Sequence, residues 1–232
     1  MTYSKSRFIA AIFGVMLTSS AIVLPEALAT TSWLTIGQAS TSASATELSG
    51  FVSVPHSPGS GALGITELFL GGWSSSGHSY LNQPQIVPIT SSYWRGYMEV
   101  YDQQCGCDAE MKFQTNVTPV QSDTVRFDAY LSSGQSCQTV KDASTGATAT
   151  HCFSAHTYGS TYNTAWASLE STDYTSTDWT PMDGTISFTN INQYVSGVSS
   201  HPSFSMQTQN SPPSCATGGS GGSGSTSITL SC

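Results

Sequence analysis

Asp183-Gly184-Thr185-Ile186-Ser187-Phe188-Thr189-Asn190 is the stretch that decides the fold. Between Thr185 and Thr189, hydroxyl-bearing side chains alternate with large apolar ones, and Gly and Asn flank the alternation. Residues 125–131 (Val-Arg-Phe-Asp-Ala-Tyr-Leu) show the same two-residue period. Successive side chains of a β-strand leave opposite faces. Each segment is therefore predicted to be a strand with one face toward a core and the other toward water or a cleft.

Short segments of the same character recur along the chain. They are rich in β-branched or aromatic residues, are separated by Gly, Pro, Ser and Asn, and lack the 3.6-residue period of helices. They comprise residues 50–54, 67–70, 97–101, 203–207 and 227–230. This pattern predicts an all-β sandwich or barrel. Residues 38–46 and 216–226 are of low complexity and offer little apolar surface to bury, so both are predicted to be loops.

The N-terminus has the pattern of a secretory signal peptide. Lys5 and Arg7 precede an apolar run over residues 8–24, and Ala27-Leu28-Ala29 supplies a cleavage site with small residues. A membrane anchor is the alternative, but a spanning helix needs about 20 apolar residues. We expect residues 1–29 to be removed on export and residues 30–48 to be flexible. Residues 49–232 should form one domain, a secreted monomer with no membrane contact after cleavage.

Low positive charge excludes several classes of partner. The chain has six Lys and Arg residues, two of which (Lys5 and Arg7) lie in the signal segment. The remaining four are Arg95, Lys112, Arg126 and Lys141. Nucleic acids require many such residues to neutralise phosphates, so nucleic-acid binding is not expected. No cofactor is expected either, because the sequence has no P-loop, dinucleotide fingerprint or H-E-x-x-H motif.

An even number of cysteines in an exported chain predicts disulfides. Cys137 and Cys152 flank two β-prone arms joined by the turn-like residues 143–146. A symmetric hairpin would set these two cysteines opposite each other, within bridging distance. Cys215 and Cys232 bracket the Gly/Ser-rich segment and the last predicted strand in a similar way. We therefore predict the pairs Cys137–Cys152 and Cys215–Cys232.

Cys105 and Cys107 remain after these two pairs are formed. They would close a local ring or pair elsewhere. A metal site that combines them with His151 or His156 is the alternative, but no second pair of cysteines follows at the spacing of a metal site. No metal site is therefore predicted.

Several segments, taken in order, carry a resemblance to a known family. They are S-G-F-V-S-V-P (49–55), L-F-L-G-G-W (68–73), Y-L-N-Q-P-Q-I (80–86), Y-M-E-V-Y (97–101), S-D-T-V (122–125), D-A-S-T-G (142–146), A-W (165–166) and D-G-T-I-S-F-T-N (183–190). Together they resemble the eqolisins, or glutamic peptidases, which are secreted acid endopeptidases. The resemblance implies a two-sheet antiparallel β-sandwich, a concanavalin A-like jelly roll with a cleft on its concave sheet.

The resemblance also implies a catalytic glutamine and glutamate. Gln83 matches the glutamine, whereas Ala165 stands where the family has its glutamate, just before Trp166. Glu99 and Glu170 are the candidates to replace the missing carboxylate. Positions 165 and 170 differ in parity, so on a regular strand their side chains leave opposite faces. If position 165 faces the cleft, a bulge or a shifted match is needed to bring Glu170 there.

Five aromatic residues are candidates for substrate binding, and filling of the core is their alternative role. They are Trp73, Trp94, Tyr97, Tyr101 and Trp166. For Gln83 the alternative is an amide at a strand end or turn, and for Glu99 it is a residue that faces solvent.

In the family's mechanism the glutamate accepts a proton from water and the glutamine amide donates to the oxyanion. The resemblance therefore implies a secreted acid endopeptidase that hydrolyses protein or peptide substrates, provided that a carboxylate replaces the missing one. Two alternatives stay open. One is a catalytically inactive extracellular module that binds carbohydrate or peptide, and the other is an inert envelope or matrix protein.

Overall fold

The computed structural model describes residues 34–58, 66–76, 78–102, 107–154, 156, 158–171 and 178–232. By its internal contacts the chain divides into Met1–Thr31 and Ser32–Cys232, and every described residue belongs to the second unit. The predicted signal segment 1–29 lies outside the described residues. So do Cys105 and the side chain of Cys107, on which the predicted local ring and the alternative metal site depend.

The described residues are mostly in strands. In chain order the elements are β1 (Leu34–Ala45), β2 (Glu47–Ser53), β3 (Thr66–Ser76), β4 (His78–Pro88), β5 (Trp94–Asp102), β6 (Cys107–Gln114), β7 (Thr124–Ser132), β8 (Gln135–Asp142), β9 (Thr148–Phe153), β10 (Tyr162–Ser171), the 3-10 helix η1 (Thr180–Met182), β11 (Gly184–Val195), β12 (Val198–Ser200), β13 (Ser205–Gln209), β14 (Ala216–Gly222) and β15 (Ser225–Ser231). Each strand segment predicted from the sequence overlaps one of these strands, although residue 54 follows β2 and residues 203–204 precede β13.

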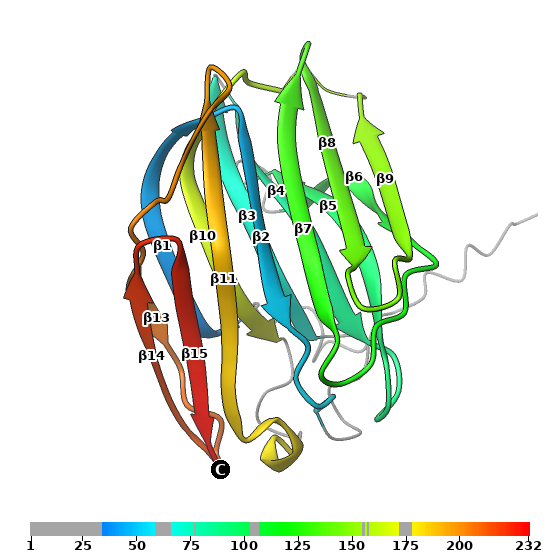
Figure 1. Ribbon diagram of the computed structural model, residues 1–232, viewed down its shortest axis with the longest axis vertical. Helices are drawn as coiled ribbons and strands as arrows, with labels where there is room; N and C mark the ends of the chain where they lie inside the picture. Colours follow the sequence, from blue (N-terminus) through cyan, green and yellow to red (C-terminus); the bar gives the residue numbers. More distant parts are fainter. Residues whose placement is uncertain are drawn as a thin grey trace, which may run out of the picture. The chain divides into compact units, whose positions relative to one another are not determined.

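These strands form two antiparallel sheets that pack face to face (Figure 1). The first sheet has the order β13-β1-β10-β3-β4-β5-β6, and the second has the order β14-β15-β11-β2-β7-β8-β9, with β12 paired to β11. Figure 1 shows the second sheet in front, running from β14 on the left to β9 on the right. The predicted two-sheet antiparallel sandwich is confirmed.

The two alternating segments behave as predicted. On β7, Val125, Phe127, Ala129 and Leu131 are buried, and the residues between them are half-buried. On β11, Ile186 and Phe188 are buried, but the alternation then shifts by one residue. Asn190 has a positive φ of 49°, and the register with β2 slips between Thr189 and Asn192. Ile191 is therefore the next residue to enter the core.

Two segments that we predicted to be loops are strands. Residues 34–45 form β1, which pairs with β10 on one side and β13 on the other, so the expectation of a flexible segment 30–48 is wrong there. Residues 216–222 form the edge strand β14. A Cβ at Gly221 would collide with the Phe204 carbonyl oxygen. Glycine thus lets backbones approach closely here, and main-chain pairing orders a segment that has little apolar surface.

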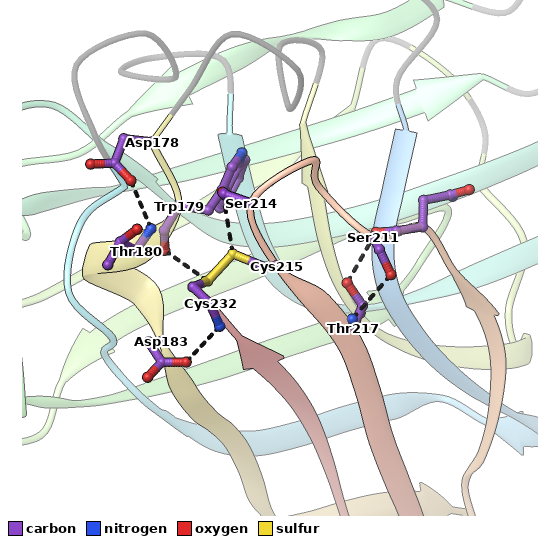
Figure 2. The surroundings of a disulfide bond; sticks show 10 residues. Asp178, Trp179, Thr180, Asp183, Ser211, Ser214, Cys215, Thr217 and Cys232 are labelled. Carbon is purple, nitrogen blue, oxygen red and sulfur yellow. Dashed lines mark hydrogen bonds between the residues drawn. A yellow bond between two sulfur atoms is a disulfide. The ribbon is translucent and has the colours of Figure 1, made fainter.

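Both predicted disulfides are present. Cys137 and Cys152 face each other on β8 and β9, with their Cα atoms 4.0 Å apart. Cys215 and Cys232 are also bonded, and their Cα atoms are likewise 4.0 Å apart. The Cys232 backbone N–H donates to Asp183 Oδ1, just after η1, over 2.8 Å. Figure 2 draws this hydrogen bond beside the disulfide. The last residue of the chain is therefore tied to the start of β11.

Candidate functional site

The candidate site lies on the face of the first sheet that is turned away from the core. Residues opposite each other in an antiparallel ladder share a face, so the register shows which side chains are neighbours. Gln83 on β4 lies opposite Glu99 on β5, and Gly71 on β3 lies opposite Trp166 on β10. The constant register of β3 with β4 places Gly71 beside Gln83. One row of neighbours thus crosses four strands: Glu99, Gln83, Gly71 and Trp166.

A cavity of about 180 Å³ opens on this face. It is lined by Glu67, Trp73, Leu81, Gln83, Glu99, Tyr101, Trp166 and Glu170. All three residues predicted to be catalytic, Gln83, Glu99 and Glu170, are in this set. The four strands β3, β4, β5 and β10 supply the lining, so the site is assembled from segments that are far apart in the sequence.

Gly71 leaves space in the middle of the row. A Cβ at this position would collide with the Asn82 carbonyl oxygen of the neighbouring strand. The close approach of the two backbones therefore requires glycine. Since glycine has no side chain, nothing from β3 fills the space between Gln83 and Trp166.

Glu99 is held through both its side chain and its backbone. The residue is 5% exposed, and Gln85 Nε2 donates to its Oε2 over 2.8 Å. From β8 of the opposite sheet, Gln138 accepts a hydrogen bond from the Glu99 N–H over 3.1 Å and donates to the Glu99 carbonyl over 2.7 Å. The β5–β6 register shifts between Met98 and Val100, so β6 contributes no ladder partner here. The alternative of a solvent-facing Glu99 is wrong.

Gln83 lies within β4, which spans His78–Pro88, and is 4% exposed. The alternative of a strand-end or turn amide is therefore wrong as well. Its place is set by pairing with β5 and by the β3 register, which are both tertiary contacts.

Strand β10 turns Glu170 toward the cavity and Ala165 away from it. The register with β3 is unbroken from Thr164 to Ser171, so side chains alternate regularly. Trp166 and Glu170 line the cavity, whereas Ala165 is 0% exposed and belongs to the core. The predicted difference in parity between 165 and 170 is thus correct. The assumption that position 165 faces the cleft is wrong, and Glu170 needs no bulge to reach it.

Glu67 is a lining residue that the sequence analysis missed. It lies directly opposite Glu170 in the β3–β10 ladder and is 3% exposed. Ser168 Oγ donates to Glu170 Oε1 over 3.0 Å. Glu170 is four residues beyond Trp166, about 13 Å along the strand. The carboxylates therefore form two groups, with Glu99 beside Gln83 and the Glu67–Glu170 pair farther along. The signal available in the sequence was that positions 67 and 73 are both odd, so that on a regular strand the Glu67 side chain shares a face with Trp73.

Three of the five candidate aromatic residues surround one end of the cavity. The Trp73 ring makes edge contacts with Trp166, at 5.9 Å between centroids and 77° between planes, and with Tyr101, at 6.3 Å and 71°. Trp94 does not belong to the site. It is 1% exposed in the core, and its indole N–H donates to the Pro55 carbonyl over 3.1 Å. Tyr97 is half-buried opposite Gln85 and is not in the lining.

Solved structures share this architecture. Scytalido-glutamic peptidase with a transition-state analogue inhibitor aligns with a TM-score of 0.62 and 16% identity, covering 86% of this chain and 100% of that chain. The chain has the glutamic peptidase fold. SCP-B, an eqolisin in complex with the tripeptide Ala-Ile-His, aligns with a TM-score of 0.53 and 13% identity, covering 87% and 98%. No protein-family profile and no curated protein matches the sequence. At these identities the likeness concerns the glutamic peptidase fold and not the chemistry.

Proposed function

We propose that this protein is a secreted acid endopeptidase in which Gln83 and Glu99 form the catalytic pair. The observation that carries the proposal is their direct opposition on β4 and β5 at the edge of one cavity. Cross-strand neighbours on one face have Cβ atoms about 4.5–5.5 Å apart. An amide and a carboxylate at that separation reach the same substrate group. A peptide as the substrate is supported by the tripeptide bound to SCP-B and by the peptide-based transition-state analogue bound in a second structure of scytalido-glutamic peptidase.

In this proposal the Glu99 carboxylate accepts a proton from a water molecule as the water oxygen attacks the scissile carbonyl carbon. The Gln83 amide N–H donates to the oxygen that becomes negative. Glu99 then delivers its proton to the leaving amine, and the C–N bond breaks. The Gln85 amide donates to Oε2 of Glu99 and orients the carboxylate. The two hydrogen bonds between the Gln138 side chain and the Glu99 backbone hold this part of β5 in place.

A binding module without catalysis is the second candidate, and the β10 strand favours it. In the row of Gln83, β10 contributes Trp166 and no carboxylate. The position that matches the family's glutamate, Ala165, faces the core. In this case the cavity would bind a peptide or a carbohydrate through its aromatic residues without hydrolysing it.

Incubation of the secreted protein with an unfolded protein at about pH 3 and at pH 7 tests the two candidates. We expect cleavage at the acidic pH. Loss of an oxyanion donor in Gln83→Ala should reduce turnover by about 100-fold or more, and Glu99→Gln should reduce it at least as much. Glu170→Gln is the matched control, because it removes the same kind of side chain from the lining of the same cavity, three strands across from Glu99 and four residues beyond its row.

Absence of cleavage by the wild type at both pH values would contradict the peptidase proposal and favour the binding module. Cleavage that Glu170→Gln abolishes, but Glu99→Gln leaves intact, would assign the base to Glu170 and refute the proposed pair.

A further inference from the structure

We propose that Asn116 is a modification site, which receives an N-linked oligosaccharide during export, and that this oligosaccharide covers the β6 edge of the first sheet. The inference goes beyond peptidase activity and rests only on the export proposed above. Asn116-Val117-Thr118 is an acceptor sequence of the form Asn-x-Ser/Thr, and no other asparagine of the chain has Ser or Thr two positions later. A match of three residues decides little in a chain this rich in serine and threonine. The placement of the two polar side chains is what favours modification.

Hydrogen bonds fasten the residues on both sides of Asn116. Residues 115–119 follow β6 and run along the first part of β5. The Thr115 N–H donates to the Gly96 carbonyl over 3.0 Å, and the Gly96 N–H donates to the Val117 carbonyl over 2.9 Å. The Val117 N–H in turn donates to Thr115 Oγ1 over 3.1 Å. Asn116 is therefore held between two anchored neighbours.

Burial alternates along this segment. Thr115 is 6% exposed and Val117 is 0% exposed, whereas Asn116 and Thr118 are exposed. In an extended chain the side chains of residues two positions apart leave the same face. The Asn116 amide and the Thr118 hydroxyl thus project together into solvent, and neither makes a hydrogen bond to another described residue. An oligosaccharide on Asn116 extends from the folded domain without displacing a core side chain.

The edge beside Asn116 has exposed apolar side chains. Strand β6 ends the first sheet, and an end strand presents backbone groups that can pair with another chain. Four large apolar side chains are exposed among the described residues, and two of them flank Asn116: Phe113, at 40%, and Val120, at 46%. An N-linked oligosaccharide is bulky and solubilising. Attached at Asn116, it would shield both side chains and hinder pairing along this edge.

The modification needs one co-substrate, an oligosaccharide joined through a diphosphate to a lipid carrier. The amide nitrogen of Asn116 forms a bond to the anomeric carbon of the sugar, while the bond from that carbon to the diphosphate oxygen breaks and the nitrogen loses one proton. The hydroxyl of Thr118 belongs to the acceptor sequence that the transferase recognises. Both side chains are therefore required.

Secretion of the full chain from a eukaryotic host tests the inference by mass spectrometry. We expect protein from the medium to carry sugar mass on Asn116, and peptide N-glycosidase to remove that mass and leave aspartate. Asn116→Gln and Thr118→Ala should each lose the sugar completely, whereas Thr118→Ser keeps a hydroxyl and should retain it. Asn163→Gln is the matched control, because Asn163 is exposed but has Ala165 two positions later. It should keep the modification.

Unmodified Asn116 in the secreted protein, or sugar that persists in Asn116→Gln and is sensitive to the glycosidase, would overturn the inference. Absence of the chain from the medium would overturn both the inference and the export on which it rests. Acid cleavage by a protein with unmodified Asn116 would refute the inference alone. A modified protein that cleaves no substrate would refute the endopeptidase proposal alone.

Light scattering at increasing protein concentration tests the cover of the β6 edge. Asn116→Gln should associate at a lower concentration than the glycosylated wild type. Adding Val120→Ser should reverse this change, because it removes one of the exposed apolar side chains. Equal association of Asn116→Gln and the glycosylated wild type would refute the covering role.

Discussion

Substitution of Ala165 by Glu is the sharpest test of how β10 is oriented. The resemblance to the glutamic peptidases implies that Ala165→Glu restores the missing catalytic carboxylate. The structure predicts the opposite, because Ala165 is 0% exposed and its side chain lies in the core between the two sheets. A carboxylate added at this position enters the core and cannot reach the cavity beside Gln83.

The cost can be estimated from the packing around Ala165. Its partner on β3 is Gly72, where a Cβ would come within 2.6 Å of Leu48 Cδ1 and 2.7 Å of Tyr162 Cδ1. The core here has no spare volume. Overpacking costs about 1–3 kcal/mol, and an uncompensated buried charge costs about 3–5 kcal/mol. A loss of about 4–8 kcal/mol is comparable to the whole stability of a domain, about 5–15 kcal/mol.

Urea unfolding followed by tryptophan fluorescence measures this loss. The protonated carboxyl is cheaper to bury, so Ala165→Glu should be less destabilising at pH 4 than at pH 7. Ala165→Leu is the control that overpacks without a carboxyl group, and it should lose about 1–3 kcal/mol at both pH values. Wild-type stability of Ala165→Glu together with a gain of acid proteolysis would refute the orientation of β10 described above.

Three further predictions follow from other parts of the structure. Gln138→Leu removes the two hydrogen bonds that Gln138 makes with the buried N–H and carbonyl of Glu99. The free energy of unfolding, measured in urea, should fall by about 2–4 kcal/mol. An unchanged midpoint would contradict a stabilising role of Gln138. Burial and the neighbouring Asp128 raise the pKa of Glu47 above 4.5, and Arg126 opposes this shift. The folded state therefore binds the Glu47 proton more tightly than the unfolded state does, and the stability of the protein falls as pH rises from about 4.5. Glu47→Gln should flatten the dependence of Tm on pH between 4 and 7. An unaltered slope would argue against this contribution of Glu47. Replacing both Cys215 and Cys232 by Ser opens a loop with a sequence separation of 17. The free energy of unfolding should fall by about 3 kcal/mol, measured by urea unfolding with Tm as a second readout. Equal stability of the variant and the wild type would count against the estimate.

Local patterns in the sequence were sufficient for much of the fold. The alternation at 125–131 and 185–189 predicted β7 and the first part of β11 because burial on one face imposes a two-residue period. The hairpin symmetry around Cys137 and Cys152 predicted their bond because a short turn aligns the two arms. Both signals act over fewer than about twenty residues. The predictions failed at β1 and β14, where pairing with distant strands orders segments whose composition is typical of loops.

The sequence by itself determined that Gln83, Glu99 and Glu170 were the side chains to consider, and that positions 165 and 170 lie on opposite faces of one strand. Only the tertiary structure decided which of those faces is the cavity. The reason is that the two-residue period shows which side chains share a face and not which face is inside, and β10 carries apolar residues on both. Glu67 and Glu170 lie on strands about a hundred residues apart in the sequence, so their opposition depends on the register between β3 and β10, which no local pattern specifies.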